Sequence, residues 1–92
     1  MSRETLIAIL TRAADADAAG KRYAARTDHE LTVHFGDPAR AMSVEHVVAV
    51  ELTPTHAEIE VRERGILYAP YEAVHAVLSA PTRAKRGGNV GF

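Results

Sequence analysis

The chain lacks cysteine and tryptophan, and only 5% of its 92 residues are aromatic. The absence of cysteine excludes disulfide bonds, thiolate catalysis and cysteine-ligated zinc sites. With so few aromatic side chains, the core must be built from Leu, Ile, Val and Ala, and small cores are often supported by self-association. The N-terminal apolar run, residues 6–10, is too short for a signal-peptide core or a membrane span, so we expect a cytoplasmic protein with no membrane partner.

A strong excess of one charge is also missing, because eleven Lys and Arg residues face twelve Asp and Glu residues. Domains that bind nucleic acid through its phosphates usually carry a basic excess. The apolar fraction of 47% and the charged fraction of 25% are typical of a globular domain. We therefore expect one small domain over residues 1–82, followed by a flexible, basic and glycine-rich tail over residues 83–92.

An amphipathic helix is predicted at the N-terminus. Apolar side chains recur with helical spacing at Leu6, Ile9, Leu10, Ala13 and Ala14. Ser2 is suited to cap the start of this helix and Gly20 to end it. Because the alanine-rich residues 13–19 also favour a helix, we expect it to cover residues 3–19.

The chain after the helix reads as short strands. The predicted strands cover residues 30–35, 39–42, 47–52, 57–61 and 66–68. In the first and fourth of these segments, apolar and polar side chains alternate, which is typical of half-buried strands. In the third, we expect Val48, Val50 and Leu52 to share one face. Residues 63–65 predict a hairpin turn.

Residues 70–78 allow two interpretations. Pro70 is suited to the first turn of a short helix, with Tyr71, Val74 and Leu78 on one side. Alternatively, a single 3₁₀ turn leads into a last strand in which Val74, Ala76 and Leu78 alternate with their neighbours. A short apolar run does not decide between the two.

Residues 43–50 and 70–77 form an internal echo, because Glu, Val, Ala and Val recur in the same places. The echo is either a duplicated β-unit or a coincidence of common strand residues. Both interpretations lead to the same α+β fold class. One N-terminal helix is followed by about five short, mostly antiparallel strands that form a small barrel or a strongly bent sheet.

The histidines are the first candidates for chemistry. His29, His34, His46, His56 and His75 show neither the i+2 nor the i+4 spacing of local metal ligands. A metal or small-ligand site assembled from separate strands, such as His34 with His46 or His75, stays an alternative. His46 beside Glu45 is the candidate for a pH-sensitive residue. We expect no metal and no cofactor.

No catalytic constellation is visible, and we expect the protein not to be an enzyme. None of its serines lies in a nucleophile elbow. Glu58 and Glu60 fall on the solvent side of a predicted strand with Arg62, where they solubilise the sheet. The basic residues Arg83, Lys85 and Arg86 either solubilise the tail or follow an RNA backbone, with bases stacked on Tyr68, Tyr71 or Phe92.

Residues 66–77, Ile-Leu-Tyr-Ala-Pro-Tyr-Glu-Ala-Val-His-Ala-Val, resemble the end of the Sm-like fold, and the hydrophobic pattern extends this resemblance over residues 30–81. Compared with the Hfq-type RNA chaperones of that family, Gly-Asp-Pro at residues 36–38 replaces an Asn-Gly turn. The Tyr-Lys-His sequence of the uridine pocket is also absent, because Glu-Ala follows Tyr71. The resemblance implies a ring-forming oligomer and makes Tyr71 and His75 candidate nucleotide contacts.

The sequence thus favours a non-enzymatic binding module that associates with itself or docks to a protein partner. The expected contact surfaces are an exposed sheet edge and the alanine-rich side of the helix. RNA binding through Tyr71, His75 and the tail is the alternative.

Overall fold

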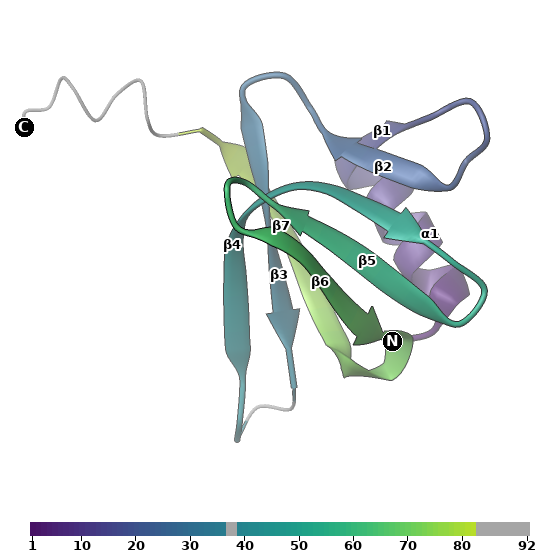
Figure 1. The fold of residues 1–92 in the computed structure, drawn as a ribbon, viewed down its shortest axis with the longest axis vertical. Helices are drawn as coiled ribbons and strands as arrows, with labels where there is room; N and C mark the ends of the chain where they lie inside the picture. Colours follow the sequence, from purple (N-terminus) through teal and green to yellow (C-terminus); the bar gives the residue numbers. More distant parts are fainter. Residues whose placement is uncertain (37–38, 83–92) are drawn as a thin grey trace, which may run out of the picture.

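The fold is one helix followed by a strongly curled antiparallel sheet that forms half of a barrel (Figure 1). A computed structural model describes residues 1–36 and 39–82. The elements are α1 (Arg3–Ala13), β1 (Ala14–Ala16), β2 (Arg22–Ala25), β3 (His29–Phe35), β4 (Met42–Leu52), β5 (His56–Val61), β6 (Gly65–Pro70), the 3₁₀ turn η1 (Tyr71–Ala73) and β7 (Val74–Pro81). The predicted α+β class with a strongly bent sheet is confirmed.

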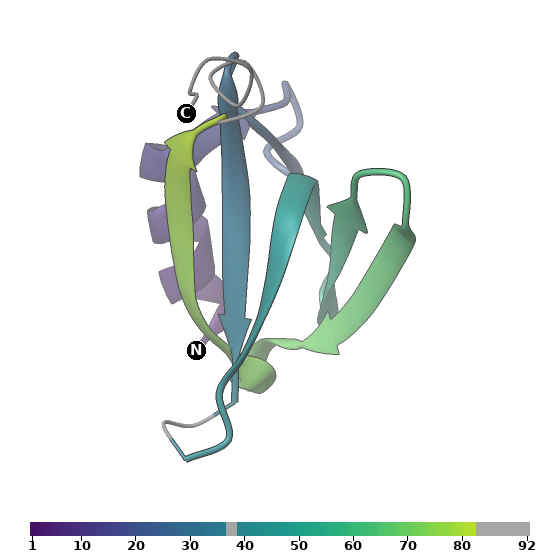
Figure 2. The ribbon, with the colours of Figure 1, turned by 90° about the vertical axis from the view of Figure 1, so that its left-hand side faces the viewer.

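The long strand β4 organises the sheet. β5 pairs with one edge of β4, and β2 and β3 pair with successive parts of its other edge. β7 pairs with β3, β6 pairs with β5, and β1 pairs with β2. Figure 2 shows the curl of this sheet, with α1 lying behind β3 and β7.

The core fills the space between α1 and the inner face of the sheet. The helix contributes Leu6 and Leu10, and the strands contribute mainly Leu31, Val33, Val47, Val50, Ile59 and Val74. Most of the core side chains are aliphatic, as the low aromatic content predicted, but Tyr23, Phe35 and Tyr71 are also buried in it. No helix of the described residues is long and apolar enough to span a bilayer.

The helix ends earlier than predicted. It begins after the Ser2 cap, whose hydroxyl accepts the Thr5 N–H, but it stops at Ala13 instead of residue 19. The alanines that follow offer no large side chain to hold further turns on the core. Instead, Ala14 is buried and starts β1, and the Asp17 carboxylate accepts the backbone N–H groups of Lys21 and Arg22. Gly20, with φ of +72°, therefore lies in a β1–β2 hairpin turn.

Two strand predictions are also corrected. Residues 39–41 belong to no strand, and β4 begins only at Met42. The expected face of Val48, Val50 and Leu52 is broken, because the register of β4 shifts against both β3 and β5 near His46. As a result Val47 and Ala49 are buried while Val48 is only half-buried.

The second interpretation of residues 70–78 is the observed one, a 3₁₀ turn followed by a strand. The expected alternation of Val74, Ala76 and Leu78 does not hold along β7. The register against β3 shifts between Val74 and Ala76, so that Val74 is buried and Leu78 is exposed. The internal echo does not extend to structure, because residues 43–50 lie wholly in β4 while residues 70–77 contain η1.

Candidate binding site

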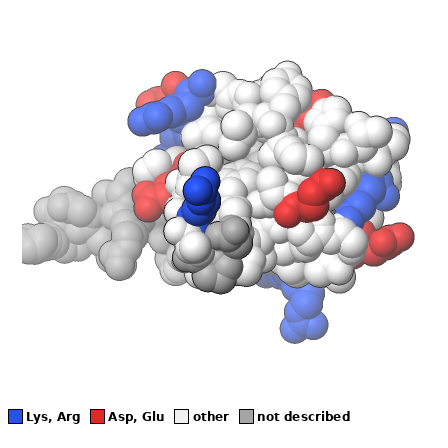
Figure 3. All heavy atoms as spheres, turned by 90° about the horizontal axis from the view of Figure 1, so that it is seen from below, with Lys and Arg blue, Asp and Glu red and all other residues white. Residues whose placement is uncertain are grey.

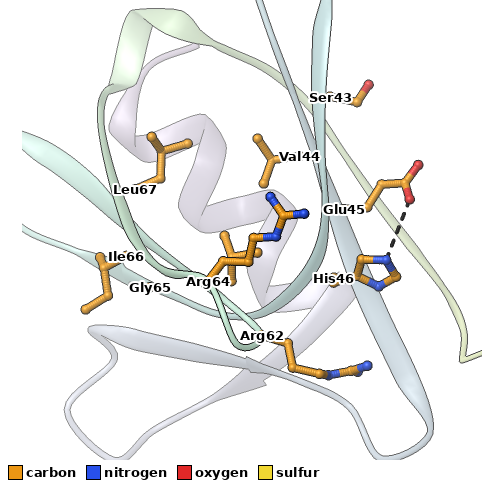
Figure 4. Close-up of a pocket in the computed structure, with 10 residues that line it drawn as sticks. Ser43, Val44, Glu45, His46, Arg62, Arg64, Gly65, Ile66 and Leu67 are labelled. Atoms are coloured by element: carbon orange, nitrogen blue, oxygen red, sulfur yellow. Dashed lines mark ion pairs between the residues drawn. The ribbon is translucent and has the colours of Figure 1, made fainter.

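A groove of about 590 Å³ opens between the first half of β4 and the β5–β6 hairpin (Figure 4). β4 contributes residues 43–46, and the hairpin contributes Val61, Arg62, Arg64, Gly65, Ile66 and Leu67. Its size falls within the range of small-ligand and short-peptide pockets. Sequence reasoning missed this site, because its two walls lie far apart along the chain.

The groove exists because β4 loses a neighbour at His46. The last backbone hydrogen bond between the β5–β6 hairpin and this part of β4 runs from the Arg62 N–H to the His46 carbonyl, at 2.9 Å. Beyond it, residues 42–45 pair with β3 alone among the described strands. His46 has φ of +63°, an uncommon conformation for a residue with a side chain, and it lies where the register shifts. Pairing with β5 ends there, because the turn over residues 62–64 reverses the chain, and one edge of β4 stays open beyond the bulge.

A three-residue polar cluster holds the bulge. Nδ1 of His46 donates to Glu30 Oε1 at 3.1 Å, and the Arg62 guanidinium donates to Glu30 Oε2 at 3.0 Å. The Glu30 side chain is only 20% exposed, so these contacts are partly shielded from water. Glu45, the partner expected for His46, is more distant at 3.9 Å. One carboxylate from β3 thus joins β4 to the end of β5.

Arg64 differs from Arg62 in having no such partner. Its side chain forms no hydrogen bond or ion pair with any described residue, and Figure 4 shows it extending from the hairpin toward Val44. Val44, Val61 and Leu67 are half-buried apolar side chains that pack against the core. The groove therefore combines an apolar floor with one uncompensated guanidinium.

Two of the three end strands of the described sheet, β6 and β7, form a second candidate surface, and β1 is the third. Among the described residues, β6 pairs only with β5 and β7 only with β3, so each has one open edge. Neither strand contains Asp, Glu, Lys or Arg. Ile66 and Tyr68 on β6 are 51% and 62% exposed, and Leu78 on β7 is 51% exposed.

A further polar cluster closes the turn before β5. Nε2 of His56 donates to Glu58 at 3.0 Å, and its Nδ1 lies 2.9 Å from the Thr55 hydroxyl. The Thr53 hydroxyl accepts the backbone N–H groups of Thr55 and His56 and donates to the His56 carbonyl. These contacts fix a tight turn. Glu58 thus has a defined partner rather than acting only as a solvated surface charge.

Of the residues predicted from sequence as nucleotide contacts, the structure describes Tyr71 and His75. Tyr71 is only 8% exposed, and its hydroxyl donates to the Thr53 carbonyl in the core. His75 is exposed on β7. Arg83, Lys85 and Arg86 lie outside the described residues, as does the predicted tail. The buried ring of Tyr71 leaves no open face on which a base could stack.

The histidines also remain separate. His34 hydrogen-bonds with Ser43, and the His29 ring contacts the Thr27 carbonyl. Within residues 1–36 and 39–82, no three His, Asp or Glu side chains are grouped as metal ligands would be. In Figure 3, acidic and basic side chains are scattered over a mostly uncharged face, and several of them lie next to a side chain of opposite charge.

No protein-family model, curated protein or solved structure matches this chain. The case for a function therefore comes from the groove and from the two open strand edges.

Proposed function

We propose that this domain is a non-enzymatic interaction module that associates with copies of itself through the open edges of β6 and β7. The observation that carries the proposal is the absence of charged residues from both edge strands, together with the exposure of Ile66, Tyr68 and Leu78. Proteins that remain monomeric usually protect such edges with charges, proline or bulges. Here Pro70 and Pro81 lie at the ends of their strands and the register shift of β7 lies near its start, between Val74 and Ala76, so most of each edge stays open.

The two edges are different surfaces of one sheet. Pairing of β6 in one copy with β7 in the next is a head-to-tail contact, which closes into a ring or continues as a filament. Apolar side chains on both strands add buried area to the backbone hydrogen bonds. The Sm-like resemblance of residues 30–81 implies the same outcome, a ring.

Light scattering after size exclusion tests the proposal. We expect the wild-type chain to form oligomers, and Tyr68→Lys and Leu78→Lys each to reduce them, because lysine on an edge strand opposes strand addition. Ala8→Lys is the matched control, since Ala8 is exposed on α1 and lies outside both edge strands and the groove. A wild-type chain that stays monomeric at millimolar concentration would overturn the proposal.

A mixing experiment tests the head-to-tail arrangement. Tyr68→Lys blocks β6 and leaves β7 open, whereas Leu78→Lys does the reverse. An equimolar mixture of the two variants should therefore form a dimer through one intact β6–β7 contact. If β6 pairs with β6 instead, the mixture contains no dimer that combines both variants.

A further inference from the structure

We propose that the groove beside β4 binds an extended segment of a partner protein, and that this segment carries a carboxylate side chain between apolar residues. The groove lies inside the curl of the sheet, between β4 and the β5–β6 hairpin, and its binding does not depend on self-association through β6 and β7. It is a second site with its own chemistry.

The backbone of β4 provides the first part of the argument. Residues 42–45 have one edge paired with β3 and the other facing the groove, where β5 has already ended. An extended segment placed there takes the position that β5 vacates and satisfies the open backbone groups by strand addition. The open edge is about 14 Å long at the usual rise per residue, which accommodates about four residues.

The floor of the groove provides the second part. Val44, Val61 and Leu67 are only partly buried, although each packs against the core. An apolar side chain from the added strand would remove the remaining surface of these residues from water. Because residues i and i+2 of a strand point to the same face, the side chain two positions further along the segment also faces the groove, on the side where Arg64 lies.

Charge provides the third part. Arg64 has no partner among the described residues, whereas Arg62 is already bound to Glu30. Figure 4 shows Arg64 pointing toward Val44, while Glu45 and His46 lie on the other side of β4. A guanidinium next to an apolar floor favours a carboxylate, which it can bind through two parallel hydrogen bonds. The chain's own basic residues Arg83, Lys85 and Arg86 would instead be repelled.

The strained backbone of His46 is a further feature of this groove. A positive φ on a residue with a side chain costs free energy and persists only where surrounding contacts enforce it. Here Glu30 holds the His46 ring at the last residue of β4 that bonds to the β5–β6 hairpin. The contact fixes the backbone of β4 at the end of the open edge formed by residues 42–45.

The test uses a peptide with an N-terminal fluorescein and a C-terminal amide, Val-Thr-Glu-Thr-Val, in which the glutamate and both valines share one face of a strand. The protein carries Leu78→Lys, which separates peptide binding from self-association. We expect fluorescence anisotropy to show saturable binding. Amide chemical-shift changes should concentrate at residues 42–45 and 64–67. Replacing Glu by Gln in the peptide should weaken binding about tenfold, the effect of one charged hydrogen-bonded contact. N-methylation of the two valines should abolish it, because it removes strand hydrogen bonds.

Arg64→Gln should weaken binding of the Glu peptide about tenfold and leave binding of the Gln peptide unchanged. Arg12→Gln is the matched control, because Arg12 is exposed on α1 and does not line the groove. Dispersed amide spectra of both variants establish that they are folded. Equal affinity for the Glu and Gln peptides, shifts confined to other residues, or no binding at millimolar peptide would overturn the proposal. Groove shifts that depend on protein concentration without peptide would also overturn it, since they indicate a second copy as the occupant.

Discussion

The Glu30 carboxylate lies 3.1 Å from the imidazole of His46, a residue whose φ of +63° places it in the left-handed region. The contact links β3 to the point where β4 bulges. The contact holds the His46 side chain in place, although glycine would adopt this backbone conformation more easily.

Glycine should therefore be better tolerated than alanine at position 46. Both substitutions remove the contact with Glu30, but alanine retains the strain of a positive φ. We expect His46→Ala to have a free energy of unfolding about 1 kcal/mol lower than His46→Gly. Urea denaturation at one fixed protein concentration measures this difference, since self-association raises apparent stability. At the neighbouring Glu45, whose φ is not positive, the order should reverse.

The hydroxyl of Tyr71 should contribute to stability, whereas that of Tyr68 should not. Tyr71 is buried and donates to the Thr53 carbonyl, while Tyr68 is 62% exposed. Tyr71→Phe should lower the free energy of unfolding by about 1 kcal/mol, the usual net contribution of one hydrogen bond. Tyr68→Phe should change it by less than about 0.5 kcal/mol. Equal effects of the two substitutions in chemical denaturation would contradict the core position of Tyr71.

Gly36 should be less replaceable than Gly20, although both have a positive φ. A Cβ atom on Gly36 would lie 2.7 Å from the Arg40 carbonyl oxygen, whereas one on Gly20 meets nothing within 4 Å. Gly36→Ala should therefore cost about 1–3 kcal/mol more than Gly20→Ala, which is the usual cost of forcing atoms into occupied space. Thermal unfolding of the two variants gives the comparison. A larger loss for Gly20→Ala would show that the Gly36 turn relaxes freely.

Asp17 should make stability depend on pH in the acidic range. The backbone N–H groups of Lys21 and Arg22 donate to its carboxylate and hold its pKa below the ordinary value of 3.8. The folded state therefore binds this proton less readily than the unfolded state. The resulting stability is present above pH 3.8 and is lost as the pH falls through the lowered pKa.

Asp17→Asn keeps an oxygen acceptor but removes the titration. We expect the variant to lose less stability than the wild type between pH 5 and pH 2. A carboxyl ¹³C titration that places the Asp17 midpoint at or above 3.8 would contradict this explanation.

Local sequence patterns predicted the elements that depend on local physics. Ser2 capped the helix, alternation located β3 and β5, and residues 63–65 formed the hairpin turn. The helix end was mispredicted because alanine propensity favours continuation. In the folded chain, Ala14 gains more by pairing with Ala25 in the β1–β2 hairpin.

The groove could not be predicted in the same way. It depends on a bulge at His46, and nothing in the surrounding β-branched sequence indicates a positive φ there. Its stabilising partner Glu30 comes from β3, and Arg64 comes from the turn between β5 and β6. The alternation of apolar and polar residues along the sequence does not show which distant strands pair or where their register changes.

β4 is also the only strand that joins the β1–β2 hairpin and the β5–β6 hairpin to the rest of the described sheet, because β2, β3 and β5 all pair with it. Neither hairpin pairs with β3 directly, and the Arg62–Glu30 contact links β3 to the β5–β6 hairpin through side chains alone, so we expect no half of the domain to retain its structure once β4 detaches. Amide protons of residues 49–51, which lie between two partner strands, should exchange with deuterium only when the whole domain unfolds. Those of residues 42–45 should exchange through local opening, which gives one continuous strand two very different exchange rates.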